Sequence, residues 1–159
     1  MLVFQMRDSR WAMPAKVFPL VRVNKIIVHC SATPDDESWT VERIRDVHVN
    51  EKHWADIGYH WVVDREGVVW EGRPETMIGA HCKGYNHESI GVCWMGGLRG
   101  ADITPAQVKA MTELLTWLHR RFPDALLYGH RDLAKTECPM LEVREMWGCV
   151  LKDGLRSKV

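Results

Sequence analysis

The sequence contains neither a long apolar run nor an excess of charge of one sign. No stretch of its 159 residues approaches the ~20 consecutive apolar residues that cross a bilayer, so we expect no membrane insertion. The first 14 residues include Arg7, Asp8 and Arg10 and lack the apolar segment of a signal peptide. These absences predict a chain without a signal peptide, cytoplasmic until another agent releases it.

The charges balance, with 21 Lys and Arg against 21 Asp and Glu. A nucleic-acid-binding domain usually carries a basic patch, whereas the basic residues here are scattered, so we expect no nucleic acid as a partner. The five cysteines are odd in number and irregularly spaced, which argues against a disulfide framework and favours a reducing compartment. A hydrophobic content of 46% is enough to build a core without such cross-links.

The hydrophobic pattern predicts an α/β domain with a single mixed central β-sheet flanked by helices. Short β-branched runs predict strands, and a Glu-Gly turn between two of them predicts a hairpin. Thr104, Pro105 and Gln107 are typical of the start of a long helix. The predicted strands are 25–31, 58–65, 68–71, 89–95 and 126–128, and the predicted helices are 40–52, 104–122 and 142–151. Residues 1–24 are interpreted as an extended lead-in segment, and residues 25–159 as the one domain.

Three potential metal ligands fall near the ends of predicted strands. His29 ends the first strand, His130 directly follows the last one, and Cys138 lies in the same loop as His130. Strand ends at one edge of an α/β sheet converge in space, so these side chains could meet. Two imidazoles and a thiolate would make a zinc site with its fourth position open, which is the pattern of catalytic zinc. A strand-end histidine that is merely a satisfied polar residue is the plainer alternative, and Cys138 acting as a nucleophile with His130 is another.

Other polar residues could line the same pocket. His60 lies in a predicted strand directly after Tyr59, and His81 lies in a Gly-rich polar loop that also contains Asn86. We predict substrate contacts for His60, His81 and Asn86. Because side chains alternate along a regular strand, only one of Tyr59 and His60 should face the site.

Six segments, taken in order, resemble a known family. They read V-H-C-S-A-T (28–33), D-I-G-Y-H-W (56–61), V-V-W-E-G-R (68–73), G-A-H-C-K-G-Y-N-H-E-S-I-G-V-C (79–93), T-P-A-Q (104–107) and G-H-R-D-L-A-K-T-E-C-P (129–139). Together they resemble the N-acetylmuramoyl-L-alanine amidases that include phage amidase lysozymes and animal peptidoglycan recognition proteins. The resemblance implies their fold, a Zn²⁺ ion held by His29, His130 and Cys138, and a catalytic role for Tyr59.

The implied reaction is hydrolysis of the amide bond between N-acetylmuramic acid and L-alanine in bacterial peptidoglycan, as in a phage or prophage endolysin. One position departs from the phage pattern, which has Lys two residues before the Cys ligand, where this chain has Thr136. Recognition proteins that keep amidase activity carry Thr there, in a T-x-C-P pattern like T-E-C-P here. The resemblance therefore implies a catalytic role for Thr136, as a neutral hydrogen-bond donor in place of that cationic group.

Two alternatives accompany this interpretation. Some relatives of this fold only bind the cell wall, usually after losing the Cys ligand, so a non-catalytic peptidoglycan-binding module is the first alternative. A phage member of the family can also inhibit an RNA polymerase, so additional regulatory binding to that enzyme is the second. The presence of Cys138 favours the enzyme. We expect a monomer that acts on peptidoglycan after its release to the cell wall.

Overall fold

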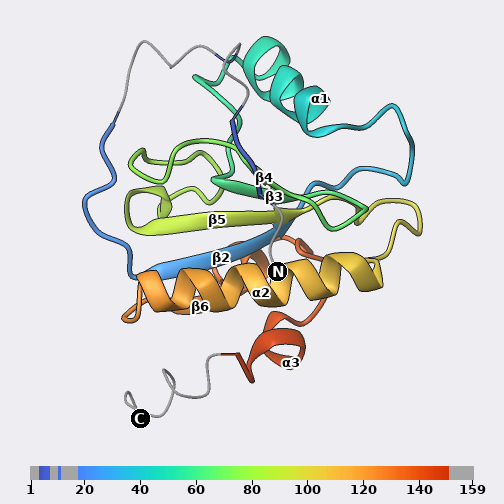
Figure 1. Cartoon of the computed structure of the whole chain (residues 1–159). Coiled ribbons are helices and arrows are strands. Elements are labelled where there is room, and N and C mark those ends of the chain that lie inside the picture. Colours follow the sequence, from blue (N-terminus) through green and yellow to red (C-terminus); the bar gives the residue numbers. More distant parts are fainter. Residues whose placement is uncertain (1–3, 8–10, 12–17, 151–159) are drawn as a thin grey trace.

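A six-stranded mixed sheet forms the centre of the molecule (Figure 1). The computed structural model describes residues 4–7, 11 and 18–150. The strand order is β1-β4-β3-β5-β2-β6. The strands are β1 (Phe4–Gln5), β2 (Lys25–Cys30), β3 (Trp61–Val63), β4 (Val69–Glu71), β5 (Ser89–Trp94) and β6 (Leu126–Gly129). The predicted mixed sheet is confirmed.

The four strands β3, β5, β2 and β6 run parallel, so their carboxyl ends share one edge of the sheet. β4 returns antiparallel to β3 through the predicted hairpin, where Gly67 takes a positive φ of 85°. β1 pairs in parallel with β4, so part of the lead-in segment is a strand, which the sequence pattern does not predict. Other residues of the lead-in, 1–3, 8–10 and 12–17, lie outside the described residues.

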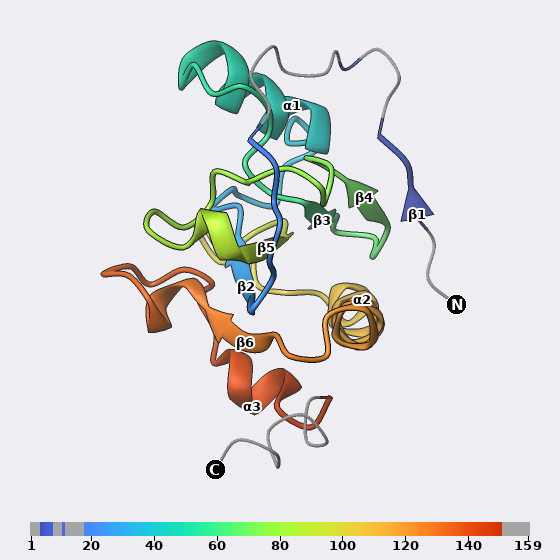
Figure 2. The same ribbon diagram turned by 90° about the vertical axis from the view of Figure 1, so that its left-hand side faces the viewer.

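The helices cover both faces of the sheet (Figures 1 and 2). One face carries α1 (Val41–Asp46), which continues as a π-helical turn, η1 (Val47–Glu51). The other face carries α2 (Pro105–Arg121) and α3 (Val143–Trp147). Two 3₁₀ turns, η2 (Asn86–Glu88) and η3 (His130–Asp132), precede β5 and follow β6. Within the described part of the chain, no helix is long and apolar enough to cross a membrane.

The helix boundaries follow from local chemistry. The Thr104 side chain accepts a hydrogen bond from the Gln107 backbone, and the Gln107 side chain accepts one from the Thr104 backbone, which is the predicted capping box. Thr40 likewise caps α1 through the backbone N–H of Arg43. The last helix, α3, is shorter than predicted, because residues 148–150 form a turn instead of a further helical turn.

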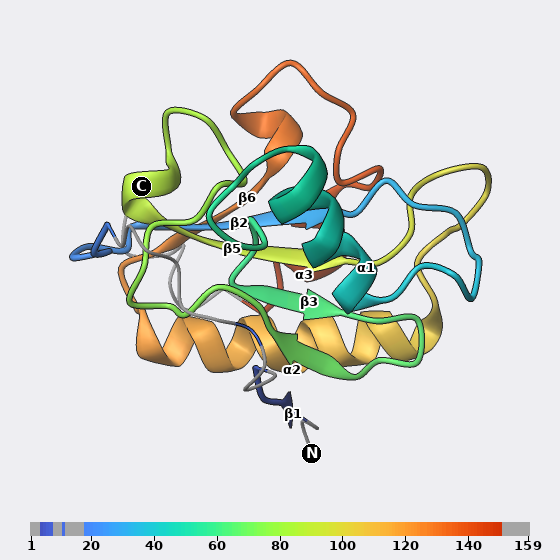
Figure 3. The ribbon, with the colours of Figure 1, turned by 90° about the horizontal axis from the view of Figure 1, so that it is seen from above.

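Alternation along β2 sends neighbouring side chains into two different environments. Ile26, Val28 and Cys30 belong to the apolar core that includes the buried residues of α2. His29 has the opposite direction, on the face that carries α1. Seen from above, α1 and the loop after β6 flank this face of β2 (Figure 3). The sheet therefore presents His29 between two segments that are far apart in the sequence.

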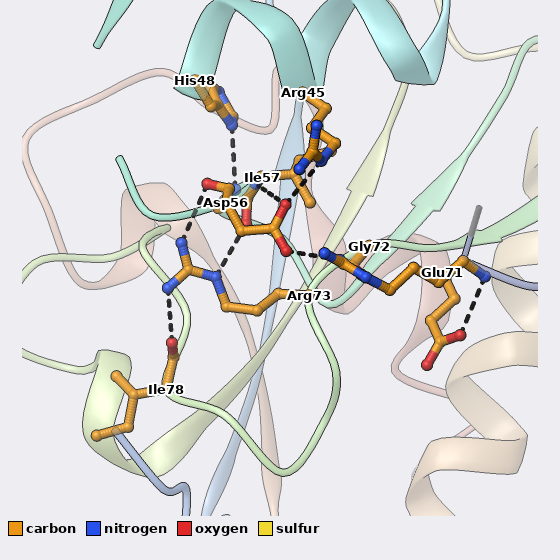
Figure 4. A network of polar contacts seen from close by, with 10 residues as sticks. Arg45, His48, Asp56, Ile57, Glu71, Gly72, Arg73 and Ile78 are labelled. Carbon is orange, nitrogen blue, oxygen red and sulfur yellow. Dashed lines mark hydrogen bonds and ion pairs between the residues drawn. The ribbon is translucent and has the colours of Figure 1, made fainter. Parts of the chain in front are cut away.

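A buried ion-pair network fastens the segment that leads into β3 (Figure 4). Asp56 is fully buried and pairs with Arg7 and Arg45. The Arg73 guanidinium donates to three backbone carbonyl oxygens, those of Asp56, Ile57 and Ile78, at 2.8–3.1 Å. The network ties β1, α1 and the loop after β4 together and holds the chain just before Tyr59.

Candidate metal centre

The pairing of β2 with β6 brings two histidines together. Val28 lies opposite Gly129 in this parallel pair, so His29 and His130 are the next residues on each side. Their ring centroids are 4.6 Å apart. His29 is 1% exposed, whereas His130, the first residue of η3, is half-buried. The predicted convergence at this edge of the sheet is confirmed for the two imidazoles.

The loop after η3 returns Cys138 to the same point. The backbone N–H of Arg131 donates to the carbonyl oxygen of Cys138 at 2.8 Å, which closes the loop. The backbone N–H of Cys30 points at the Cys138 sulfur, 3.3 Å away, and this sulfur lies 3.8 Å from Nδ1 of His29. A backbone N–H directed at a sulfur favours its thiolate form, which is the form that binds metals.

One ligand atom from each of His29, His130 and Cys138 lies within 4.8 Å of the others. Ligand atoms around a tetrahedral zinc ion lie about 3.4–3.6 Å apart, given bond lengths of about 2.0 Å to nitrogen and about 2.3 Å to sulfur. The distance of 3.8 Å between the Cys138 sulfur and His29 Nδ1 is already close to these values, and none of the three spacings exceeds 4.8 Å. The donor set and its geometry therefore fit a divalent ion with one position open to solvent.

The environment of this cluster keeps both imidazoles neutral. Burial, and to a smaller degree His130, lowers the pKa of His29 well below its usual value. Burial also lowers the pKa of His130. The side-chain hydrogen bond with Cys30, together with burial, raises the pKa of the Cys138 thiol. Each neutral imidazole therefore has a lone pair available for a cation, and binding of the cation would release one proton from the Cys138 thiol.

Tyr59 lies beside the cluster, with its ring centroid 5.4 Å from that of His29. Burial, then the sulfurs of Cys93, Cys138 and Cys30, raise its pKa well above the usual value, so the phenol stays protonated and can donate a hydrogen bond. His60 lies on the same side, 5.8 Å from the ring of His81. The expected alternation of Tyr59 and His60 fails because β3 begins only at Trp61.

The remaining predicted site residues have internal partners. His60 is fully buried; its Nδ1 accepts from the Gly91 backbone, and its Nε2 lies 2.7 Å from the Met77 carbonyl oxygen. The side-chain oxygen of Asn86, Oδ1, accepts from the backbone N–H groups of His81 and Cys82. The substrate contacts predicted for His60, His81 and Asn86 stay predictions, and these bonds favour supporting roles.

Thr136 is exposed and lies two residues before Cys138. Its hydroxyl oxygen accepts from the Cys138 backbone N–H at 3.2 Å, so it stabilises the turn that presents the sulfur. Its predicted role in catalysis stays a prediction.

The sequence patterns did not single out Ser89, which contacts the His81 ring, or the Cys30 backbone, which contacts the Cys138 sulfur. Ser89 could have been found from its position, because it shares one face of β5 with Gly91 and Cys93.

The fold and the cluster together define a class of protein. Residues 19–140 match the family of N-acetylmuramoyl-L-alanine amidases. The chain belongs to this family, and it is an enzyme that hydrolyses the amide bond that gives the family its name.

Among individual proteins, the chain is similar to phage endolysins and to peptidoglycan recognition proteins. The chain is 40% identical over 134 residues to the endolysin of Enterobacteria phage T3, which covers 81% of this chain and 88% of the relative. The structure of the Ph2119 endolysin from a Thermus scotoductus bacteriophage superposes with a TM-score of 0.79 at 29% identity, covering 95% of this chain and 98% of that one. Wild-type Drosophila PGRP-LB superposes with a TM-score of 0.73 at 26% identity, covering 86% and 88%.

Proposed function

We propose that the chain is a zinc-dependent endolysin, in which His29, His130 and Cys138 hold Zn²⁺ and the neighbouring side chains cut the sugar–peptide bond of peptidoglycan. The observation that carries this proposal is the meeting of two imidazoles and one sulfur within 4.8 Å. These three residues come from β2, η3 and the loop behind it, and no other residue is needed to complete a three-ligand catalytic site.

A zinc ion bound there would polarise the amide carbonyl and lower the pKa of water to ~7. The chain's own residues supply the rest. Burial keeps the Tyr59 phenol protonated, so its hydroxyl can donate to the oxygen that gains negative charge when the carbonyl is attacked. The Thr136 hydroxyl can also donate its own hydrogen while its oxygen accepts from the Cys138 backbone.

The alternative of a cysteine nucleophile has less support. Such an enzyme needs a thiol whose pKa is lowered by a charged histidine. Here the hydrogen bond with the Cys30 side chain, followed by burial, raises the pKa of Cys138, and burial lowers the pKa of His130, so neither group favours an ion pair. The same two shifts suit a metal site, where the imidazole must be neutral and the cation removes the thiol proton.

The test combines metal analysis with mass spectrometry of digested peptidoglycan. The purified chain should contain one equivalent of zinc and should release stem peptides that begin with L-alanine, leaving intact glycan strands. A chelator should abolish this release, and added zinc should restore it. Zinc-free protein that cleaves at the full rate, or zinc-loaded protein that binds peptidoglycan without cleaving it, would refute the proposal; the second result would identify a recognition module.

A further inference from the structure

A third histidine lies directly behind the metal centre and is not one of the three ligands. Nδ1 of His81 is 2.8 Å from Nε2 of His29, while Nδ1 of His29 is the atom that faces the Cys138 sulfur. The other nitrogen of His81, Nε2, is 3.2 Å from the hydroxyl oxygen of Ser89. His81 is only 9% exposed, so both of its ring nitrogens are used inside the protein.

The direction of every hydrogen bond in this series is set by its last member. The Ser89 hydroxyl lies 2.7 Å from the backbone carbonyl oxygen of Tyr85, which can only accept, so the hydroxyl donates to it. The Ser89 oxygen therefore accepts from Nε2–H of His81. A neutral His81 then has a bare Nδ1, which accepts from Nε2–H of His29. His29 is left with its Nδ1 lone pair directed at the metal position.

The loop before β5 is built to hold the His81 ring in this place. The Asn86 side chain accepts from the backbone N–H of His81 and fixes the start of the loop. Gly91 lies under the ring, and a Cβ there would come within 2.5 Å of the His81 ring carbon Cγ. A Cβ at Gly79 would also come too close, at 2.7 Å from the His81 ring carbon Cδ2. The absence of side chains at the two glycines therefore leaves room for the His81 ring, and Ser89 provides its hydrogen-bond partner.

We infer that His81 is a positioning residue, which fixes the tautomer and ring orientation of His29 so that its Nδ1 lone pair meets the metal. The inference rests on the proposed function for the identity of the metal. It differs from the substrate contact predicted from the sequence, because a ring whose two nitrogens are bonded internally offers none to a substrate. Partners of this kind typically change metal affinity by about 10–100-fold.

The experiment compares zinc dissociation constants, measured by chelator competition on metal-free protein, across matched variants. His81→Leu removes the acceptor and should weaken zinc binding by about 10–100-fold. His81→Asn places an amide oxygen near the former Nδ1 and should recover most of that loss. Ser89→Ala, a milder change that leaves the ring in place, should fall between wild type and His81→Leu. The exposed His87 in the same loop is the control, and His87→Asn should bind zinc like wild type.

A second readout needs no metal at all. In metal-free protein, ¹⁵N NMR of the imidazoles should show His29 protonated at Nε2 and bare at Nδ1, and His81→Leu should give a mixture of the two tautomers. A purely structural role for His81 would lower the melting temperature of the metal-free protein and leave zinc affinity and the His29 tautomer unchanged, which would overturn the inference. Equal zinc affinity of the Leu and Asn variants would overturn it too.

The two readouts also separate this inference from the proposed function. Wild type that binds no zinc but shows the expected His29 tautomer would refute the zinc enzyme and keep the positioning role. If wild type binds zinc, and His81→Leu and Ser89→Ala bind it equally tightly, the zinc enzyme would stand and the positioning role would be refuted.

Discussion

Two buried polar clusters lie on the same side of the sheet, and they differ in how their polar groups are paired. Around Asp56, the carboxylate is matched by Arg7 and Arg45, and the guanidinium of Arg73 is bonded to carbonyl oxygens (Figure 4). The cluster of His29, His130 and Cys138 has no such balance, because its three donor atoms face one another. Burial of polar groups is costly unless they are paired, so the Asp56 cluster is complete by itself, and we propose that a cation completes the second, incomplete cluster.

The largest expected effect comes from removing a donor from the incomplete cluster. Cys138→Ser should reduce peptidoglycan cleavage by at least about 10³-fold through loss of the metal. In the proposed mechanism the metal both polarises the amide carbonyl and activates the attacking water. The folded metal-free protein should keep its melting temperature. Zinc content and released amino groups measure the effect. The exposed Cys149 gives the control, and Cys149→Ser should behave like wild type in both assays.

The complete cluster should respond in the opposite way. Asp56→Ala leaves Arg7 and Arg45 without their buried counter-charge and should lower the free energy of unfolding by about 3–5 kcal/mol. Zinc affinity of the fraction that remains folded should not change. Urea denaturation measures the loss, with Asp46→Ala, in the exposed Arg43–Asp46 pair, as a control that should matter far less. An Asp56 variant as stable as wild type would remove the contrast between the two clusters.

Tyr59 lies beside the incomplete cluster and is not one of its three proposed metal ligands. Tyr59→Phe should lower kcat by about 10²-fold, as loss of one preorganised donor does, and should leave zinc affinity unchanged. Tyr128→Phe, in β6, should leave kcat at the wild-type level. If Tyr59→Phe instead lost zinc and kept its kcat when fully loaded, the phenol would belong to the metal's support and not to the reacting groups.

Acid should weaken the metal-free fold through the buried imidazoles. Burial lowers the pKa of both His48 and His60 to about 4 from the usual 6.5. Between pH 6.5 and about 4 the unfolded chain binds protons that the folded chain does not, so stability is complete above 6.5 and falls as pH drops through this window. Calorimetry of metal-free protein should show the melting temperature falling there. A flat profile from pH 6.5 to 4.5 would mean that these rings are protonated in the native state.

Much of the fold could be predicted because its signals are local, whereas the three candidate ligands were reached from their strand-end positions together with the family resemblance. The β-branched run before His29 predicts a strand, and the capping residues of α2 predict the start of a helix. Each prediction needs only a few adjacent residues. The two-residue strand β1 carries no such periodicity, since it is defined by its pairing with β4. Tyr59 and His60 look like alternating strand residues, and only the late start of β3 shows that they are not.

The supporting residues could not be predicted from the sequence for a different reason. Whether His81 touches substrate or another histidine depends on Gly91 leaving room under its ring and on Ser89 lying within 3.2 Å. Both are contacts between a loop and a strand, and a pattern of residue types does not contain them. The same holds for the Cys30 backbone N–H that points at Cys138.

The central claim, that one cation joins His29, His130 and Cys138, is tested most directly by X-ray absorption at the zinc edge of the native protein. The account predicts one sulfur at about 2.3 Å and a first shell otherwise made of nitrogen and oxygen at about 2.0–2.1 Å, with the outer scattering of two imidazoles. A first shell without sulfur, or with two sulfurs, would contradict it.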